Sequence, residues 1–308
     1  MAKHPTLLQH FRSFAYQNHI EDFDTALSYF TLFGGTGWEI DVRQEKELLV
    51  EKKILTNYEA LHQGITRYTH NNGLYHRLLS MIALGLNHED ALFKKTRVGK
   101  EKGEEAIDYL VMKSLLYFDY SVEKPLQKED AKANRVFFRL PFMRFWFALV
   151  SPYYLKIQRG DFSEFKEKYK EYESNFAIEL SNVLVHDLVK KQMTLLDKED
   201  PIVSMGSYYD KHVSIEILAV RKSGKLIAGE CKYSVKAAKI QMLETLKQKC
   251  EKVELEVSEY VLFSKHGFSA EFEALKKANI HFLTQKEMSL LLEDLSQEDK
   301  LDYKNKKY

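Results

Sequence analysis

One hairpin constrains the fold of this chain more than any other segment. The stretch SIEILAVRKSGKLIAGECKYS runs from Ser214 to Ser234, and two aliphatic runs flank its polar centre. A type I turn closed by a residue at positive φ requires glycine in its last position. Gly224 meets this requirement if the loop consists of Lys222, Ser223 and Gly224. The sequence therefore predicts a three-residue loop rather than the two-residue loop Ser223-Gly224.

The length of this loop decides which charged side chains share a face of the hairpin. Three residues in the loop pair Glu216 with Glu230 and Ser214 with Lys232, so these four are predicted on one face. A two-residue loop would place the two glutamates on opposite faces. The other face is predicted to be a core face, formed by Val213, Ile215, Ile217, Ala219, Ile227 and Cys231.

Two carboxylates and one ammonium at the end of a strand pair indicate metal chemistry. Neighbouring carboxylates raise one another's pKa unless a cation lies between them. Mg²⁺ prefers carboxylate oxygen and keeps several of its waters, whose pKa it lowers. A nearby lysine can position the attacking hydroxide or neutralise a phosphoryl oxygen. The pattern thus predicts a metal-dependent phosphodiesterase site with Glu216, Glu230 and Lys232 as catalytic residues.

The same triplet also has a purely structural interpretation. Glu-x-Lys is common on strands, and cross-strand Glu–Lys pairs usually only solvate an exposed face. The predicted face is not simply solvated, because it also carries Leu218, Val220, Leu226 and Ala228. The elements that surround the hairpin favour the functional interpretation.

The whole chain predicts an α+β fold with a helical N-terminal part over residues 1–72. Three short helices and two β-prone pieces follow, which is the order of a winged helix-turn-helix over residues 73–140. An aromatic helix over 141–155 and a charged helix after it occupy residues 141–171. From 172 to 295 the order α-β-β-α-β-α-β predicts a mixed sheet flanked by helices, one of them over 269–279, and a last helix begins at 285. A polar tail occupies residues 296–308.

Five cations cluster between the second and third helices of the predicted winged helix, where DNA phosphates would lie. These candidate nucleic-acid-binding residues are Lys94, Lys95, Arg97, Lys100 and Lys102. The third helix also carries acids that repel phosphate, namely Glu101, Glu104, Glu105 and Asp108. DNA binding and a protein-docking or spacer role therefore both remain open for this segment.

Composition limits the partners and the compartment. The net charge of +1 means that any nucleic-acid contact must come from a local patch. The two cysteines, Cys231 and Cys250, argue against a disulfide framework and fit a reducing, cytoplasmic compartment. The N-terminus has no secretory signal. The most apolar run, Leu140 to Leu155, is too short for a bilayer and contains Arg144, so no membrane contact is expected.

Glu216 and the triplet from Glu230 to Lys232 resemble the PD-(D/E)xK nuclease superfamily, in which an acid ends one strand and a (D/E)-x-K triplet lies on the next. More narrowly, residues from about Tyr75 to Leu291 resemble the C-terminal region of the archaeal-type DEXX-box ATPases, a family of unknown function. Three segments carry this resemblance. They are GEEAIDYLVMKSLL, FFRLPFMRFWFALVSPY and GSYYDKHVSIEILAVRKSGKLIAGECKYS, of which GECK is the most specific part.

The resemblance implies a restriction-endonuclease-like core behind a winged helix. It implies Mg²⁺ held by Glu216, Glu230 and the backbone carbonyl of Cys231, with Lys232 assisting hydrolysis of a nucleic-acid phosphodiester, most directly DNA. Many nucleases of this class act as dimers to cut two strands, so a homodimer is open as well. The chain has no Walker A motif, so it would be a stand-alone version, and any ATPase would be a separate partner.

Two departures from the family pattern favour weak or lost catalysis. Glu216 stands where the family usually has aspartate, and a shift of about an ångström in such a site can cost about 100-fold in rate. The preceding helix has Phe176-Ala177 where the family often has Phe-Glu, and Glu173, one turn earlier, is the candidate auxiliary acid. Two functions follow: an Mg²⁺-dependent nuclease, or a degenerate nuclease fold that binds DNA or a protein.

Overall fold

The computed structural model describes residues 4–275 and 279–301 and divides the chain into two compact units. The first unit comprises residues up to 118, residues 133–181 and residues from 294 onward. The second comprises residues 119–132 and 182–293. Residues 302–308 of the predicted polar tail lie outside the described residues. Within the part that is described, every helix is too short or too polar to span a bilayer.

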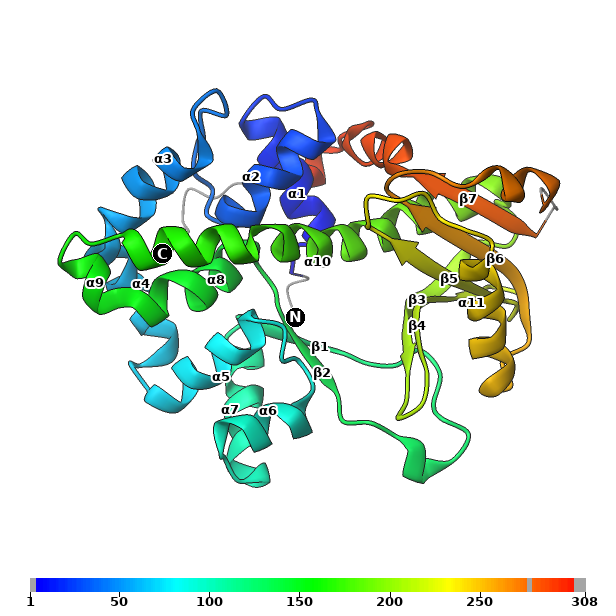
Figure 1. The fold of residues 1–308 in the computed structure, drawn as a ribbon, viewed down its shortest axis with the longest axis horizontal. Helices are drawn as coiled ribbons and strands as arrows, with labels where there is room; N and C mark the ends of the chain where they lie inside the picture. Colours follow the sequence, from blue (N-terminus) through cyan, green and yellow to red (C-terminus); the bar gives the residue numbers. More distant parts are fainter. Residues whose placement is uncertain (1–3, 276–278, 302–308) are drawn as a thin grey trace. The chain divides into compact units, whose positions relative to one another are not determined.

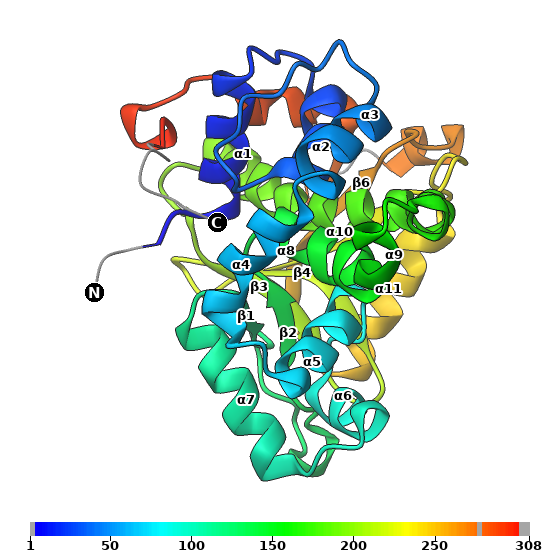
Figure 2. The same cartoon turned by 90° about the vertical axis from the view of Figure 1, so that its left-hand side faces the viewer.

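Helices build the N-terminal part of the first unit, as predicted (Figure 2). Side chains cap their free N–H groups: Asp22 accepts from the Thr25 N–H at 2.7 Å, and Asn72 accepts from the Leu74 N–H at 2.9 Å. The helices are α1 (Leu7–Gln17), α2 (Phe23–Phe33), α3 (Lys46–Val50), α4 (Tyr58–Thr69), α5 (Gly73–Ala83), α6 (Glu89–Thr96) and α7 (Lys100–Met112).

Residues 73–140 show the predicted order of three helices and two strands. After α5, α6 and α7 the chain forms β1 (Leu116–Asp119) and β2 (Arg135–Phe138). Helices α6 and α7 approach closely because Gly103 has no side chain: a Cβ there would lie 2.6 Å from the Phe93 ring. The order of elements agrees with the prediction, and the assignment as a winged helix stays a prediction.

The charged connection between β1 and β2 belongs to the second unit. It lies along β3 (Ile202–Tyr209), where the Val122 N–H donates to the Ser207 carbonyl oxygen at 2.9 Å. The Tyr209 hydroxyl also donates to the Asp119 carbonyl oxygen, at 2.7 Å. The sequence analysis did not predict β3, because its exposed Val203 and its Gly206 interrupt the alternation of apolar and polar residues.

Aromatic residues after β2 form a core of the first unit. The single helix predicted from 141 to 155 is divided into α8 (Pro141–Phe145), a π-helical turn (Trp146–Val150), a 3₁₀ turn (Ser151–Tyr153) and α9 (Tyr154–Gln158). Trp146 is fully buried and stacks on Tyr58 of α4, with ring centroids 5.4 Å apart and planes 9° apart. The two helices predicted next form one helix, α10 (Ser163–Leu196), which contributes to both units.

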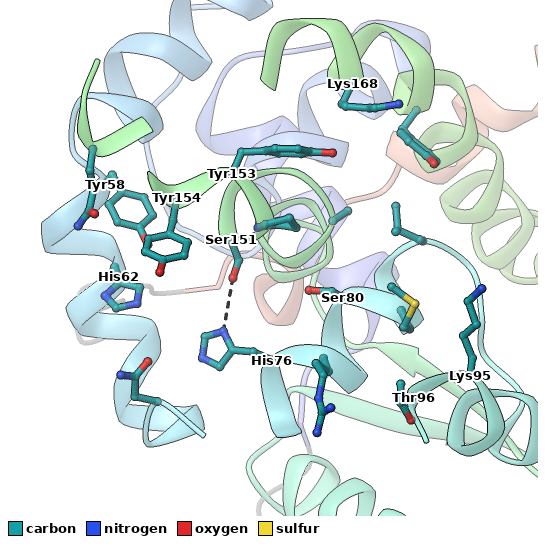
Figure 3. A pocket seen from close by; sticks show the side chains of 18 of the residues that line it. Tyr58, His62, His76, Ser80, Lys95, Thr96, Ser151, Tyr153, Tyr154 and Lys168 are labelled. Atoms are coloured by element: carbon teal, nitrogen blue, oxygen red, sulfur yellow. Dashed lines mark hydrogen bonds between the residues drawn. The ribbon is translucent and has the colours of Figure 1, made fainter. Parts of the chain in front are cut away.

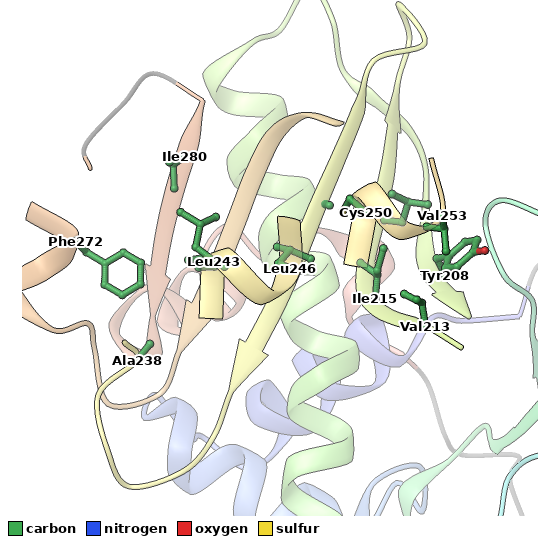
Figure 4. Packing of buried hydrophobic residues seen from close by; sticks show 13 residues of the cluster. Tyr208, Val213, Ile215, Ala238, Leu243, Leu246, Cys250, Val253, Phe272 and Ile280 are labelled. Atoms are coloured by element: carbon green, nitrogen blue, oxygen red, sulfur yellow. The ribbon is translucent and has the colours of Figure 1, made fainter. Parts of the chain in front are cut away.

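The second unit contains the predicted mixed sheet, with five strands in the order β3-β4-β5-β6-β7 (Figure 1). Strands β3, β4 and β5 are antiparallel, whereas β5, β6 and β7 are parallel. Helix α11 lies on one face, and Leu243, Leu246 and Cys250 from it pack into the hydrophobic cluster of Figure 4. The bounds are β4 (Ser214–Arg221), β5 (Leu226–Lys232), α11 (Gln241–Lys252), β6 (Val257–Ser264) and β7 (Ile280–Thr284).

Two helices predicted near the end of the chain are 3₁₀ segments, Ala270–Leu275 and Gln285–Leu292. The first was predicted to continue to Asn279, and residues 276–278 of that prediction lie outside the described residues. The second begins at a capping box in which Thr284 and Glu287 bond one another's backbone, so its start agrees with the prediction.

Candidate functional site

The hairpin of β4 and β5 has the predicted register. Gly224 closes the three-residue loop at φ +89°, and the Arg221 N–H donates to the Lys225 carbonyl oxygen at 2.9 Å. Ile217 pairs with Gly229, and Val220 pairs with Leu226. The described pairing ends at Ile217 and Gly229, so the turn chemistry gave the register of these pairs correctly, and Glu216 and Glu230 follow beyond them.

A β-bulge in β4 changes the faces on which the side chains lie. Gly206 of β3 pairs with Leu218 but Tyr208 pairs with Ile215, so Ser207 stands opposite two residues, Glu216 and Ile217. The extra residue reverses the alternation of the strand. Val213 and Ile215 consequently join Leu218, Ala228 and Leu262 in the cluster under α11 (Figure 4).

The prediction that Val213 and Ile215 share a face with Ile217 is therefore wrong, as is the prediction of one face for all four polar residues. Glu230 follows Ala228 by two positions and lies on the α11 face with Lys232. Ser214 and Glu216 flank Ile215, which lies in the cluster under α11, so alternation along the strand puts both on the other face. The single-face prediction failed because it counted along β4 without its neighbour β3.

Glu216 is held by the backbone of β5. Its Oε2 accepts a hydrogen bond from the Cys231 N–H at 2.6 Å. Burial, and next the negative charge of Glu230, raise the pKa of Glu216 above its ordinary value. Burial and the charge of Glu216 likewise raise the pKa of the Cys231 thiol. On the same side His186 of α10 hydrogen-bonds to the Glu216 backbone, and burial lowers the pKa of this histidine.

Glu230 and Lys232 line a cavity of about 350 Å³ beside the start of α11. The described residues that line it are Glu230, Lys232, Lys239, Gln241, Met242 and Thr245, and Glu216 is not among them. The Lys232 ammonium donates to the Ala237 carbonyl oxygen at 3.2 Å. The structure thus brings together the second acid and the lysine of the predicted triad but leaves the first acid outside their cavity.

Lys249 is the residue that the sequence analysis missed. Its Nζ lies 2.8 Å from Glu230 Oε1 and 3.0 Å from Oε2, so it binds both carboxylate oxygens. Burial raises the pKa of Glu230, and the Lys249 ammonium partly opposes this effect. The helical spacing of Leu243, Leu246 and Cys250 indicates that α11 packs on the sheet, but it does not reveal which acid a lysine on that helix meets.

The predicted magnesium ligands do not fit a formed metal site in this arrangement. Within residues 4–275 and 279–301, no three histidine, cysteine, aspartate or glutamate side chains come close enough to hold an ion. Both oxygens of Glu230 are bound by an internal ammonium. Glu216 lies on the opposite face and accepts from the backbone of Cys231, the residue whose carbonyl was the third predicted ligand. A hard cation would need all three groups on one side.

Glu173, the predicted auxiliary acid, lies in the first unit. Its carboxylate forms an ion pair with Lys46. Glu179, two turns further along α10, pairs with the buried Arg144 at 2.8 Å. Both acids near the expected Phe-Glu position are thus engaged by cations of their own unit.

The five predicted nucleic-acid-binding cations are all exposed on the first unit. Lys94 and Lys95 lie in the last turn of α6, and Arg97 follows the helix in the left-handed conformation at φ +54°. Lys100 and Lys102 lie in the first turn of α7. Lys100 approaches Glu104 at 3.8 Å, and the other acids of α7 named above lie on the same helix. Cations and acids therefore share this surface, as the sequence indicated.

Comparisons with known proteins identify relatives for part of the chain. Residues 146–262 match the family DUF234, described as archaea bacterial proteins of unknown function. No curated protein matches. A repair endonuclease from Pyrococcus abyssi matches a structure search with 13% identity over 33% of this chain and 45% of its own, at a TM-score of 0.25. Protein VC1899 from Vibrio cholerae matches with 12% identity over 81% of this chain and 55% of its own, at a TM-score of 0.29. The chain spans about half of the length of each.

Proposed function

We propose that this protein binds nucleic acid and that its second unit is a nuclease-type fold that does not hydrolyse its ligand. The observation that carries the proposal is the contact of Lys249 with both oxygens of Glu230. In the site implied by the PD-(D/E)xK resemblance, a divalent ion would neutralise this acid. An ammonium is a fixed part of the chain and carries no water to activate, so it balances the charge without supplying a nucleophile.

The remaining cations of the cavity fit a phosphate group. Lys232 and Lys239 line it, and the only acid among its described lining residues, Glu230, is already paired. Lysine binds phosphate as a point charge and needs no metal to do so. In this proposal the cavity holds a backbone phosphate of a nucleic acid, and the five exposed cations from Lys94 to Lys102 bind further phosphates.

An Mg²⁺-dependent nuclease is the second candidate. Proximity favours it, because the charge of Glu230 acts on the pKa of Glu216. Glu216, Glu230 and the Cys231 carbonyl would hold the ion, which supplies a metal-activated water, and Lys232 would neutralise the phosphate. This candidate requires Glu216 to cross to the α11 face and Lys249 to leave Glu230.

Plasmid nicking in MgCl₂ distinguishes the two candidates. We expect the wild type to bind plasmid and leave it uncut, because Lys249 holds both oxygens of Glu230. Lys249→Met frees that carboxylate, and we expect the melting temperature of this variant, unlike that of the wild type, to rise with added MgCl₂. Lys252→Met, at the exposed end of the same helix, is the matched control and should behave as the wild type.

Mg²⁺-dependent nicking by the wild type that is lost in Lys232→Ala would establish the second candidate and refute the first. The absence of nicking together with an MgCl₂-dependent melting temperature in Lys249→Met alone would support the first. If the melting temperature of Lys249→Met does not change with MgCl₂, Glu230 is not available to a cation even without Lys249.

Binding of duplex DNA should depend steeply on salt. The double variant Lys94→Ala/Lys102→Ala removes two phosphate contacts, so we expect the slope of log K against log salt to become shallower by about 2, at about 0.9 per contact. Lys128→Ala/Lys132→Ala removes two equally exposed lysines from the connection of the second unit and should leave the slope unchanged. Fluorescence anisotropy of a labelled duplex at several salt concentrations measures both. Equal slopes in all three proteins would refute binding through this surface.

A further inference from the structure

A cavity of about 890 Å³ lies within the first unit, and two of the exposed cations described above, Lys95 and Arg97, are among its lining residues (Figure 3). Residues of α4, α5, α6, α9 and α10 line it, and all of them belong to that unit. Pockets that hold small ligands typically enclose roughly 300–1,000 Å³. The cavity is therefore large enough for a ligand with a ring system and a charged group.

Positive charge gathers at this cavity. Arg77, Lys95, Arg97 and Lys168 line it, and none of the described lining residues is an aspartate or a glutamate. Lys168 pairs with Glu171 at 2.7 Å. Arg77, Lys95 and Arg97 form no ion pair with any acid in residues 4–275 and 279–301. Three cations without a counter-charge favour an anion, and arginine and lysine together are the usual ligands of phosphate.

The cavity also carries neutral hydrogen-bonding groups. One ring nitrogen of His76 lies 3.0 Å from Thr69 Oγ1, and the other lies 3.4 Å from Ser151 Oγ (Figure 3). Burial, and next the nearby His62, lower the pKa of His76, so this imidazole is neutral at pH 7. Both ring nitrogens of His76 are thus engaged, so the polar contact offered to a ligand is the Ser151 hydroxyl, which suits hydroxyl groups or the edge of a base.

Tyrosines supply the aromatic part of the wall. Tyr58 is buried and stacks on Trp146, and burial raises its pKa to about 12. Tyr154 lies beside it and is 43% exposed, so one face of its ring is open to a ligand (Figure 3). Tyr153 and Tyr172 also line the cavity, near Lys168. Stacking of a base on an exposed aromatic ring contributes about 1–3 kcal/mol per base.

We propose that this cavity binds a nucleotide unit, meaning an aromatic base joined to a phosphorylated sugar. The phosphate contacts Arg77 of α5, and the base stacks on Tyr154. Two sources provide the same chemistry, a free mononucleotide and the phosphorylated end of a nucleic-acid strand. The inference does not rest on the proposed function of the second unit, because each residue that carries it lies in the first unit.

Calorimetric titration of the full chain tests the proposal. The probes are the four ribonucleoside 5′-monophosphates and a 5′-phosphorylated tetrathymidylate, with adenosine and inorganic phosphate as partial ligands. We expect saturable binding of at least one nucleotide probe with a Kd below about 1 mM, and weaker binding of both partial ligands. Tyr154→Ala and Arg77→Ala should each weaken binding of the nucleotide about 10-fold, since each removes one half of the recognition.

Two control variants keep the result specific to the cavity. Tyr16→Ala removes a tyrosine that is 49% exposed elsewhere in the first unit, and Lys52→Ala removes an exposed cation of that unit that does not line the cavity. Both should bind the probes as the wild type does. Equal weakening by Lys52→Ala and Arg77→Ala would overturn the proposal, because it would indicate diffuse attraction to the surface.

The probes also separate the two sources. Binding of the tetranucleotide at least about 10-fold tighter than of any mononucleotide identifies a strand end, and comparable binding identifies a free nucleotide. Either result supports the proposal. It is refuted if none of the five nucleotide probes binds, or if inorganic phosphate binds as tightly as they do. Loss of duplex binding in the Lys94→Ala/Lys102→Ala variant would leave it intact, because neither residue lines the cavity.

Discussion

Replacement of Arg144 by methionine is expected to lower the free energy of unfolding of the first unit by about 3–5 kcal/mol at pH 7. Arg144 is 7% exposed, and its guanidinium pairs with Glu179 at 2.8 Å. Its Nε donates to the Ala83 carbonyl oxygen at 3.1 Å, and the group lies over the Phe176 ring at 4.7 Å. Methionine keeps the apolar length of the side chain but leaves the partly buried Glu179 carboxylate without a cation.

The stability lost in Arg144→Met should be larger at pH 7 than at pH 4.5. Burial raises the pKa of Glu179, and the charge of Arg144 only partly opposes this effect. An acid with a raised pKa contributes stability that is complete below its ordinary pKa of 4.5 and is lost as pH rises through the folded value. Without Arg144 the pKa rises further, so the variant should lose less at pH 4.5 than at pH 7.

Tryptophan fluorescence in urea measures this prediction, because both tryptophans, Trp38 and Trp146, lie in the first unit. The double variant Arg144→Met/Glu179→Met is the control. It removes both charges, and we expect its stability to return to within about 1 kcal/mol of the wild type or above it. A single variant that unfolds at the wild-type urea concentration would show that this pair contributes nothing.

The sequence predicted the features of the hairpin that local chemistry determines. A three-residue loop of this kind needs a last residue with positive φ, and Gly224 supplies it. The length of the loop then fixes which residues pair across β4 and β5. The face on which each side chain of β4 lies depends also on how β4 pairs with β3. Ser207 of β3 stands opposite two residues of β4, and a bulge between strands cannot be read from either strand alone.

Contacts between distant segments account for the other differences. Lys249 meets Glu230 because α11 packs on the sheet in one particular rotation, and helical periodicity identifies the buried stripe without fixing the partner of each residue on its border. The cavity of the first unit is similar. Its cations and tyrosines come from five helices, so no single segment of the sequence carries its signature.

Replacement of Arg221 by methionine should destabilise the second unit by about 3–5 kcal/mol at pH 7. Arg221 is 3% exposed and pairs with Glu259 of β6 through two contacts, at 2.7 and 3.2 Å. Its Nη1 also donates to the Asp200 carbonyl oxygen at 2.7 Å. This side chain joins the loop end of the hairpin to β6 and to the segment before β3, so its loss should loosen the strands that carry Glu216 and Glu230.

The pH dependence of this variant should be weaker than that of the wild type. Burial alone would raise the pKa of Glu259, but the hydrogen bonds and charges of Arg221 and His281 outweigh burial and hold the pKa below its ordinary value of 4.5. Glu259 therefore contributes stability that is present above pH 4.5 and lost as pH falls through the folded pKa. In Arg221→Met only His281 still opposes burial, so the pKa of Glu259 rises and this contribution should shrink.

Urea unfolding followed by circular dichroism measures the change, and amide exchange of β4 and β5 assigns it to the second unit. Lys222→Met, at the exposed next position, is the control and should unfold as the wild type. Faster exchange in β4 and β5 of Arg221→Met, without a change in Lys222→Met, would support the argument. Unchanged exchange in both would mean that the loop and the strand pairing hold the two glutamates in place without Arg221.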